Sequence, residues 1–241
     1  PAGIHAKQVT GKPLVIHVHA TDYDRSRGNV NPTVFNIERD GMLNADHIIT
    51  VSNLTRQTVI EKYGIDPAKV TTVHNAVVPL SQELLDVQVT KPKDKIVTFL
   101  GRITMQKGPE YFVEAAAKVL KLDHNVRFVM AGSGDMMDKM ISLAAERGIA
   151  ENVDFLGYRR DINNLVGLSD LSVASSFQEG LPINLIEAMA MGNPIVATDV
   201  RGNNDAVEDG VNGYLVPVGD SGMMAEKILE LMNDREKLRT F

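Results

Sequence analysis

Six short apolar segments recur along the second part of the chain, and each is almost continuous rather than alternating with polar residues. They are residues 96–100, 126–131, 153–156, 171–174, 195–198 and 214–216. Strands with one solvent-exposed face alternate apolar and polar side chains, whereas strands buried on both faces do not. These segments are therefore typical of a parallel sheet that is covered by helices on both sides.

Helical patterns fill the stretches between these segments. Within 108–122, Phe112, Ala115 and Val119 recur at helical spacing. Further helices are predicted over 135–147, 182–191 and 220–232. Strands that alternate with helices predict an α/β domain over residues 95–241, with a Rossmann-like, doubly wound parallel sheet of about six strands. Ligands of such domains bind beyond the carboxyl ends of the strands.

Residues 1–79 are interpreted as a different unit. Three strands are predicted there, at 14–19, 47–51 and 70–73. Ser52 is a suitable N-cap and Gly64 a suitable C-cap for the helix between them. Residues 80–94 contain Pro92 and few large apolar side chains, which is typical of a linker. We therefore expect a thin three-stranded domain, a linker and a second, larger domain, in that order.

Composition excludes several classes of function. The chain of 241 residues has 25 Lys and Arg against 31 Asp and Glu, and no long basic segment, so we do not expect a nucleic-acid partner. It has no cysteine, which fits a reducing compartment, and we expect the cytoplasm. No segment approaches the roughly 20 apolar residues of a membrane span. Peripheral contact with a membrane stays open, and the sequence does not indicate an oligomeric state.

Two cations follow the first predicted strand of the larger domain. Arg102 and Lys107 lie five positions apart in a loop that begins with Gly101 and leads into a helix. Arginine binds phosphate through two parallel hydrogen bonds, and lysine acts as a mobile point charge, so the pair is suited to a diphosphate. The alternative is a pair of solvated surface charges, which is the usual state of these residue types.

A glycine-rich turn follows the second predicted strand. The segment 131–135 reads Ala-Gly-Ser-Gly-Asp and resembles the beginning of a dinucleotide fingerprint. Met137 occupies the position of the third glycine, so the pattern is a weak indication of NAD binding. The turn is explained either by a tight chain reversal or by the close approach of a ligand.

Two glutamates follow the fourth predicted strand. Glu179 and Glu187 enclose the segment Gly-Leu-Pro-Ile-Asn-Leu-Ile, and Pro182 lies at the predicted start of a helix. A carboxylate such as Glu187 can accept both hydrogen bonds of a ribose diol, while the amides of residues 180–181 can face phosphate or sugar oxygens. The alternative is that Glu187 is an ordinary polar position on an apolar helix.

These motifs together resemble the donor domain of retaining family 4 glycosyltransferases, which have the GT-B fold. The resemblance rests on residues 101–102, 107–108, 131–135, 179–187, 192–199 and 209–217. Their order, spacing and positions after predicted strands agree with the family. Residues 14–79 resemble the second half of the family's N-terminal domain, in particular 16–24 and 45–52. The resemblance therefore implies a truncated second Rossmann-like domain there and a complete donor domain over residues 95–241.

The resemblance implies a nucleotide-sugar donor, a carbohydrate or lipid acceptor, and a set of site residues. The implied donor-binding residues are Gly101, Arg102, Lys107, Gly132, Gly157, Tyr158, Glu179, Gly180, Leu181 and Glu187. The implied catalytic residues are Glu179, Arg102, Lys107 and His19. Arg102 and Lys107 would bind the diphosphate, and Glu187 the ribose. The backbone near Gly157 would contact the base.

The family also implies how the remaining residues act. Glu179 would contact the transferred sugar, His19 would face that sugar from the N-terminal domain, and residues 22–29 would form a loop near the acceptor. A purely structural histidine is the alternative for His19. The departing diphosphate gains negative charge, so fixed cations would dominate catalysis, and neither a metal nor another cofactor would be needed.

A metal site is the rival interpretation for one segment. Asp22-Tyr23-Asp24 resembles the Asp-x-Asp motif with which other transferases hold a divalent ion against a diphosphate. It lies apart from the strands that carry the other motifs, and aspartates are common in loops where they cap or turn the chain. We therefore expect no metal ligand there.

Alternative activities stay open at this stage. A nucleotide-sugar epimerase, a phosphorylase and a non-catalytic nucleotide-sugar binding module would share many of these motifs, and UDP, GDP and ADP donors are not distinguished by residues 157–160. Relatives of the family begin with additional strands and end with a further helix. We therefore expect this chain to bind nucleotide but to turn over slowly, because transfer requires both domains to close.

Overall fold

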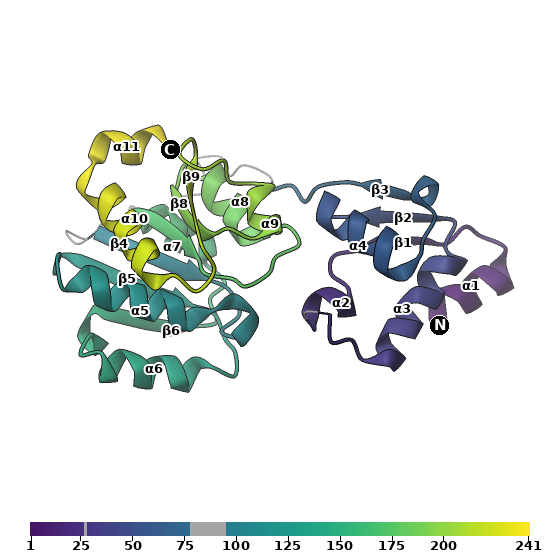
Figure 1. Cartoon of the computed structure of the whole chain (residues 1–241), viewed down its shortest axis with the longest axis horizontal. Coiled ribbons are helices and arrows are strands. Elements are labelled where there is room, and N and C mark those ends of the chain that lie inside the picture. The colour runs from purple at the N-terminus through teal and green to yellow at the C-terminus, as the bar shows by residue number, and fades with distance from the viewer. Residues whose placement is uncertain (27, 78–94) are drawn as a thin grey trace. The chain divides into compact units, whose positions relative to one another are not determined.

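A computed structural model describes residues 1–26, 28–77 and 95–241. The chain divides into two compact units, Pro1–Asn75 and Ala76–Phe241 (Figure 1). Each unit has its own parallel sheet and its own apolar core, and each is described here by itself. The expected linker at 80–94 lies outside the described residues.

A six-stranded sheet forms the centre of the second unit. Its strands are β4 (Lys95–Leu100), β5 (Val126–Ala131), β6 (Val153–Gly157), β7 (Leu171–Ala174), β8 (Ile195–Thr198) and β9 (Gly213–Val216). All neighbouring strands pair in parallel, in the order β6-β5-β4-β7-β8-β9. The predicted doubly wound sheet of about six strands is confirmed.

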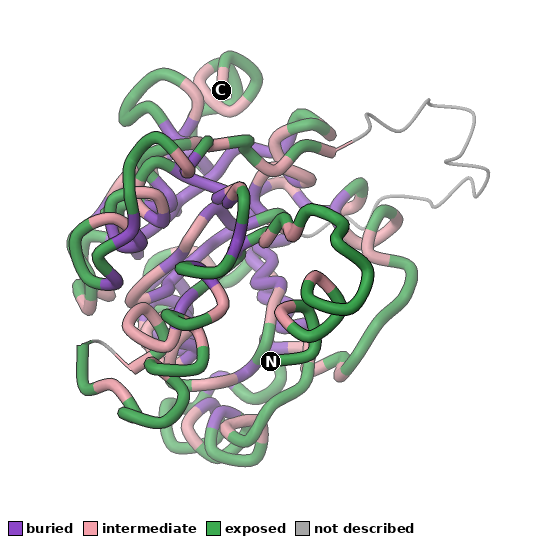
Figure 2. Tube along the Cα trace, turned by 90° about the vertical axis from the view of Figure 1, so that its right-hand side faces the viewer, coloured by how far each residue is buried: buried purple, intermediate pink, exposed green. Residues whose placement is uncertain are grey.

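Helices cover both faces of this sheet. The longer ones are α5 (Pro109–Leu120), α6 (Met137–Glu146), α7 (Ile162–Leu168), α8 (Ile183–Ala190) and α10 (Ser221–Asn233). The helices α5, α6 and α10 share one apolar cluster with the strands, whereas α7 and α8 share another. Burial on both faces explains why the strand segments do not alternate between apolar and polar residues. Figure 2 shows that buried residues are concentrated in the strands.

The described part of the second unit also contains short elements. They are α9 (Arg201–Asn204), α11 (Arg235–Thr240) and the 3₁₀ turns Met105–Lys107 and Ala150–Asn152. The four predicted helices are all present, although each begins one or two residues later than expected. Pro182 is the N-cap of α8 with an extended backbone, so it precedes the helix that it was predicted to start.

The first unit contains a three-stranded parallel sheet and four helices. They are α1 (Ala2–Thr10), β1 (Val15–Val18), α2 (Asp22–Arg25), α3 (Pro32–Asn44), β2 (His47–Thr50), α4 (Asn53–Tyr63), the 3₁₀ turn Pro67–Lys69 and β3 (Val70–Thr72). The three predicted strands are confirmed, in the order β1-β2-β3. Ser52 accepts the amide of Thr55, and Gly64 has a left-handed backbone, as expected for the two caps of α4.

Two parts of the first unit differ from expectation. The loop predicted over 22–29 begins with the short helix α2, which is closed by a capping box between Thr21 and Asp24. The helix α3 was not predicted, because only Met42 among its thirteen residues is buried and the apolar period is therefore weak. No helix in the described parts of the chain is long and apolar enough to cross a membrane.

Candidate donor site

Three loops meet beyond the carboxyl ends of β4, β5 and β6, where the sequence predicted a ligand site. The amide of Ile103 donates to the Ser133 carbonyl at 2.9 Å, and the amide of Gly132 donates to the Gly157 carbonyl at 2.8 Å. These bonds continue the parallel ladder past the strands. They bring Gly101, Gly132 and Gly157, which are distant in sequence, to one edge of the sheet.

Glycine is required in this turn by neighbouring backbone. A Cβ atom on Gly132 would lie 1.7 Å from the Gly101 carbonyl oxygen, and one on Gly134 would lie 2.1 Å from that of Ile103. Gly132 also has φ of 149°, which other residues rarely adopt. The two glycines therefore permit loop-to-loop packing, and this explains the incomplete resemblance to a dinucleotide fingerprint.

A buried ion pair lies at the same edge. Lys107, at the end of the β4 loop, pairs with Glu179, which follows β7. Their side chains are only 14% and 9% exposed, so Lys107 is not a solvated surface charge. Arg102 is exposed and donates to the side chain of Gln106 at 3.1 Å. The two predicted cations thus have different settings, one paired and enclosed and the other open to solvent.

Buried polar groups support Glu179 from behind. Ser176 donates through its hydroxyl to Glu179 Oε1 at 2.5 Å. Thr198 donates to the Ser176 carbonyl at 2.5 Å, and Asn203 donates to the Thr198 carbonyl at 2.8 Å. Ser176, Thr198 and Asn203 are all buried. The carboxylate of Glu179 is therefore positioned by a chain of hydrogen bonds that reaches from β7 across β8 to α9.

The two oxygens of Glu179 differ. Oε1 accepts hydrogen bonds from both Lys107 and Ser176. In the described part of the chain, Oε2 has no hydrogen-bond partner. It is also not fully buried, so it keeps some contact with solvent. One oxygen of the carboxylate is thus held by the protein, while the other is accessible to a ligand.

Glu187 lines a pocket beside α8. The pocket has a volume of about 280 Å³. Its lining residues are Ala76, Val77, Asn163, Ile183, Glu187, Ala190 and Met191. Burial raises the pKa of the Glu187 carboxyl, and no described residue forms an ion pair or a side-chain hydrogen bond with it. An unpaired, partly desolvated carboxylate beside apolar side chains is suited to hydroxyl donors from a ligand.

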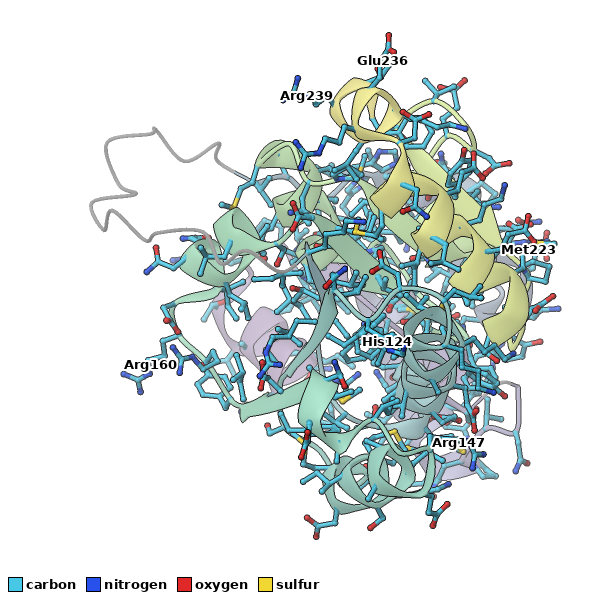
Figure 3. All side chains as sticks on the ribbon, turned by 90° about the vertical axis from the view of Figure 1, so that its left-hand side faces the viewer. His124, Arg147, Arg160, Met223, Glu236 and Arg239 are labelled. Carbon is cyan, nitrogen blue, oxygen red and sulfur yellow. The ribbon has the colours of Figure 1, made fainter. Side chains whose placement is uncertain are left out.

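Other residues of the predicted donor set differ in their settings. Gly180 and Leu181 precede the first residue of α8, so their amides belong to the turn before the helix rather than to its first turn. Leu181 is buried, whereas Tyr158 is 73% exposed. Asn184 donates to the Leu100 carbonyl at 2.6 Å, which fixes α8 against the end of β4. Figure 3 shows Arg160, from the loop after β6, projecting into solvent.

His19 lies in the other unit. It follows β1, is exposed, and has its ring 4.2 Å from that of His17. The predicted partnership of His19 with the donor-side residues stays a prediction.

The aspartates of the Asp-x-Asp segment are used by the backbone. Asp24 Oδ2 accepts the amide and hydroxyl of Thr21 at 2.9 and 2.8 Å, and Asp22 Oδ2 accepts the amide of Asn31 at 2.8 Å. These bonds are the capping and turning roles that were the alternative to a metal site. Residues 1–26, 28–77 and 95–241 contain no group of three or more metal-ligating side chains.

Sequence reasoning missed the support behind Glu179. Ser176 follows β7 by two residues, Thr198 is the last residue of β8, and Asn203 lies within α9. Small polar residues at the ends of buried strands are a signal that could have identified Ser176 and Thr198. Their contacts depend on the pairing of β7 with β8, which the sequence did not reveal.

Two protein families match the chain. The family described as Glycosyl transferases group 1 matches residues 81–241, and the family described as Glycosyltransferase Family 4 matches residues 1–79. The D-inositol 3-phosphate glycosyltransferase of Mycolicibacterium smegmatis is 35% identical over 205 residues, covering 80% of this chain and 46% of the relative. The alpha-D-kanosaminyltransferase of Streptomyces kanamyceticus is 28% identical over 248 residues, covering 95% of this chain and 64% of the relative. The chain therefore spans roughly half to two thirds of these relatives.

Solved structures are similar over almost the whole chain. HepE of Anabaena, solved in complex with UDP and glucose, has a TM-score of 0.87 at 25% identity, covering 99% of this chain and 67% of that one. TarM of Staphylococcus aureus has a TM-score of 0.83 at 24% identity, covering 96% and 45%, and shows the fold alone. The expected GT-B type of fold is confirmed. Since the matching family covers most of the chain and agrees with its motifs, this chain belongs to the glycosyl transferases group 1.

Proposed function

We propose that the protein transfers a sugar from a nucleotide-diphosphate sugar, most simply a UDP-sugar, to a glycan, lipid or small-molecule acceptor. One observation carries the proposal. The segments that follow the neighbouring strands β4 and β7 carry an enclosed lysine, Lys107, and an unpaired carboxylate, Glu187, that lines a pocket. A nucleotide diphosphate needs a cation for its phosphates and an acceptor for its ribose diol. The choice of UDP is supported by HepE, which was solved with UDP.

Each donor-side residue has a role in this proposal. Arg102 and Lys107 bind the diphosphate, Glu187 accepts the ribose hydroxyls, and the backbone near Gly157 and Tyr158 contacts the base. Gly101 and Gly132 let the loops approach the phosphates. The free oxygen of Glu179 accepts a hydroxyl of the transferred sugar, and the turn at 180–181 directs amides toward that sugar.

Charge development explains why these groups accelerate transfer. When the bond between the anomeric carbon and the diphosphate breaks, the sugar becomes cationic and the leaving group gains negative charge. Arg102 and Lys107 stabilise that gain more strongly than they stabilise the bound donor, which lowers the barrier. Because fixed cations supply this stabilisation, we propose that no metal and no cofactor is required.

We propose retention of the anomeric configuration. The acceptor attacks from the face that the diphosphate leaves, and the departing phosphate takes the acceptor proton. In this mechanism Glu179 is not a nucleophile, and its carboxylate contacts a hydroxyl of the transferred sugar. His19 faces the donor sugar from the acceptor side in this proposal.

The acceptor and the location of the reaction are proposed more broadly. Similar proteins include a D-inositol 3-phosphate glycosyltransferase and the GlcNAc-diphosphoundecaprenol galactosyltransferase of Escherichia coli, so we propose a carbohydrate or lipid acceptor. Peripheral contact with a membrane would accompany a lipid acceptor. The cysteine-free composition supports a cytoplasmic reaction.

The proposal is tested by incubating the protein with UDP-sugar, EDTA and a panel of lipid and glycan acceptors. Nuclear magnetic resonance of the product should show that an α-linked donor yields an α-linked product, and Arg102→Ala should reduce the rate at least tenfold. An inverted product would contradict retention, and a requirement for added Mg²⁺ would contradict the metal-free mechanism. Epimerised donor in the absence of acceptor would support an epimerase instead.

A further inference from the structure

The ion pair between Lys107 and Glu179 joins two groups that have different tasks in the proposed function. Lys107 is assigned to an anionic ligand, yet it already has an anionic partner in the protein. Both side chains are largely withdrawn from water, so the attraction between them is weakly screened. A diphosphate that uses Lys107 must therefore compete with Glu179.

The two partners differ in how freely they can move. The ammonium of Lys107 is carried on a flexible four-carbon stem, while its backbone is held by the hydroxyl of Ser175, which donates to the Lys107 carbonyl at 3.1 Å. Glu179 is enclosed at its backbone, because a Cβ atom on Gly202 would lie only 2.3 Å from the Glu179 carbonyl oxygen. The ammonium of Lys107 can therefore turn on its stem, whereas the backbone of Glu179 is tightly enclosed.

Ser176 remains beside Glu179 whichever way Lys107 points. Its hydroxyl donates to the same Oε1 that Lys107 contacts, at 2.5 Å. Its own carbonyl is fixed by Thr198, and both residues are buried. A carboxylate that loses its ammonium partner would otherwise be left desolvated and unpaired, which is costly. Ser176 reduces that cost by keeping one hydrogen bond in place.

Building on the proposed function, we propose that Glu179 is a placeholder anion that Lys107 exchanges for the donor diphosphate, and that Ser176 retains Glu179 after the exchange. In the free protein, Glu179 neutralises Lys107. When the diphosphate arrives, Lys107 turns to it and Glu179 is released to the hydroxyls of the sugar. Ser176 is thus a positioning residue, and diphosphate binding and sugar contact are linked through one ion pair.

The first test measures the affinity of the whole chain for UDP and for inorganic pyrophosphate by calorimetry. Glu179→Gln removes the competing charge, so both ligands should bind more tightly, by on the order of tenfold, whereas the rate of sugar transfer should fall. Uridine, which has no phosphate, should bind equally to both proteins. Glu236→Gln is the matched control, because Glu236 projects from α11 into solvent (Figure 3) and its replacement should change nothing.

The second test separates positioning from simple structural support. Ser176→Ala leaves Lys107 as the only side-chain donor to Glu179 Oε1 among the described residues, so release of the lysine costs more and UDP should bind several-fold more weakly. The two single variants should thus shift UDP affinity in opposite directions. In the double variant Ser176→Ala should have little effect, because the Glu179 carboxylate that Ser176 holds is absent.

Thermal unfolding first confirms that each variant is folded. Unchanged or weaker binding of UDP and pyrophosphate to a folded Glu179→Gln variant would overturn the exchange, and so would equal losses in both single variants. If the unaltered protein binds pyrophosphate but no nucleotide, the proposed function fails while the exchange is still tested by pyrophosphate. If it binds UDP without the opposite shifts, only the exchange fails.

Discussion

At the scale of the residue, Glu187 combines a structural cost with the role that we propose for it. Its carboxylate is half-buried and lacks a described partner, and burial raises its pKa. The folded protein therefore holds this proton to a higher pH than the unfolded chain does. Because folding favours the protonated form, the carboxyl's contribution to stability declines as the pH rises above its ordinary value of 4.5. At neutral pH the ionised group opposes folding, and a ligand that pairs with it relieves that opposition.

Glu187→Gln is therefore expected to separate stability from binding. At pH 7 the variant should melt about 1–2 °C higher than the unaltered protein, because a desolvated charge is removed. It should bind UDP roughly tenfold more weakly, because an amide is a poorer acceptor for two hydroxyls than a carboxylate. Differential scanning calorimetry with and without UDP measures both effects. A lower melting temperature together with unchanged affinity would contradict this role for Glu187.

The identity of single site residues was more predictable than their partners. Arg102 and Lys107 could be singled out because they follow a buried strand on a loop that leads into a helix, and Glu187 because of its spacing from Glu179 and its agreement with the other motifs. The pairing of Lys107 with Glu179 could not be predicted, because the two residues are 72 positions apart in the sequence. The pair is created when β4 and β7 become neighbours in the sheet, which no local pattern shows.

At the scale of the element, the turn after β5 is specified by contact with the turn after β4. Gly132→Ala should cost at least about 2 kcal/mol of unfolding free energy, because its Cβ atom meets the Gly101 carbonyl and its φ is unfavourable. Gly148→Ala is the matched control, since Gly148 has φ of 71° with no atom near its Cβ position. It should cost only about 1 kcal/mol. Urea denaturation distinguishes the two, and equal losses would show that backbone conformation alone matters.

Elements were predictable where burial is complete. The strands of the larger sheet were located almost to the residue, because both of their faces are covered and the apolar segments are continuous. The helix α3 was missed because it is mostly exposed. The start of α8 was misplaced because a proline suits the position before a helix as well as its first turn.

At the scale of the whole molecule, the donor-side residues all belong to one of the two units. Gly101, Arg102, Lys107, Gly132, Gly157, Tyr158, Glu179, Gly180, Leu181 and Glu187 lie within Ala76–Phe241, which has its own core. A chain of residues 76–241 should therefore fold alone and bind UDP with an affinity within about threefold of the whole chain. Circular dichroism and calorimetry check this. Loss of binding by a folded fragment would show that residues 1–75 contribute to the donor site.

The order of the strands was the part of the fold that the sequence concealed. The alternation of strands and helices predicts a doubly wound sheet, but the chain must still choose on which side of β4 each later strand is added. The reversal from β5 and β6 on one side to β7, β8 and β9 on the other creates the edge where the candidate site lies. The position of the candidate site beyond the strand ends was therefore predictable, whereas the loops that lie beside one another there were not.

The central claim is that this edge of the sheet binds a nucleotide diphosphate through Arg102, Lys107 and Glu187 without a metal. Calorimetric titration of the chain with UDP, GDP and ADP in EDTA tests it most directly, beside an Arg102→Ala, Glu187→Ala double variant. We predict that UDP binds with a dissociation constant below about 1 mM, which corresponds to a binding free energy more favourable than about −4 kcal/mol. The double variant should lose this binding. Absence of binding by all three nucleotides, or equal binding by the variant, would contradict the account.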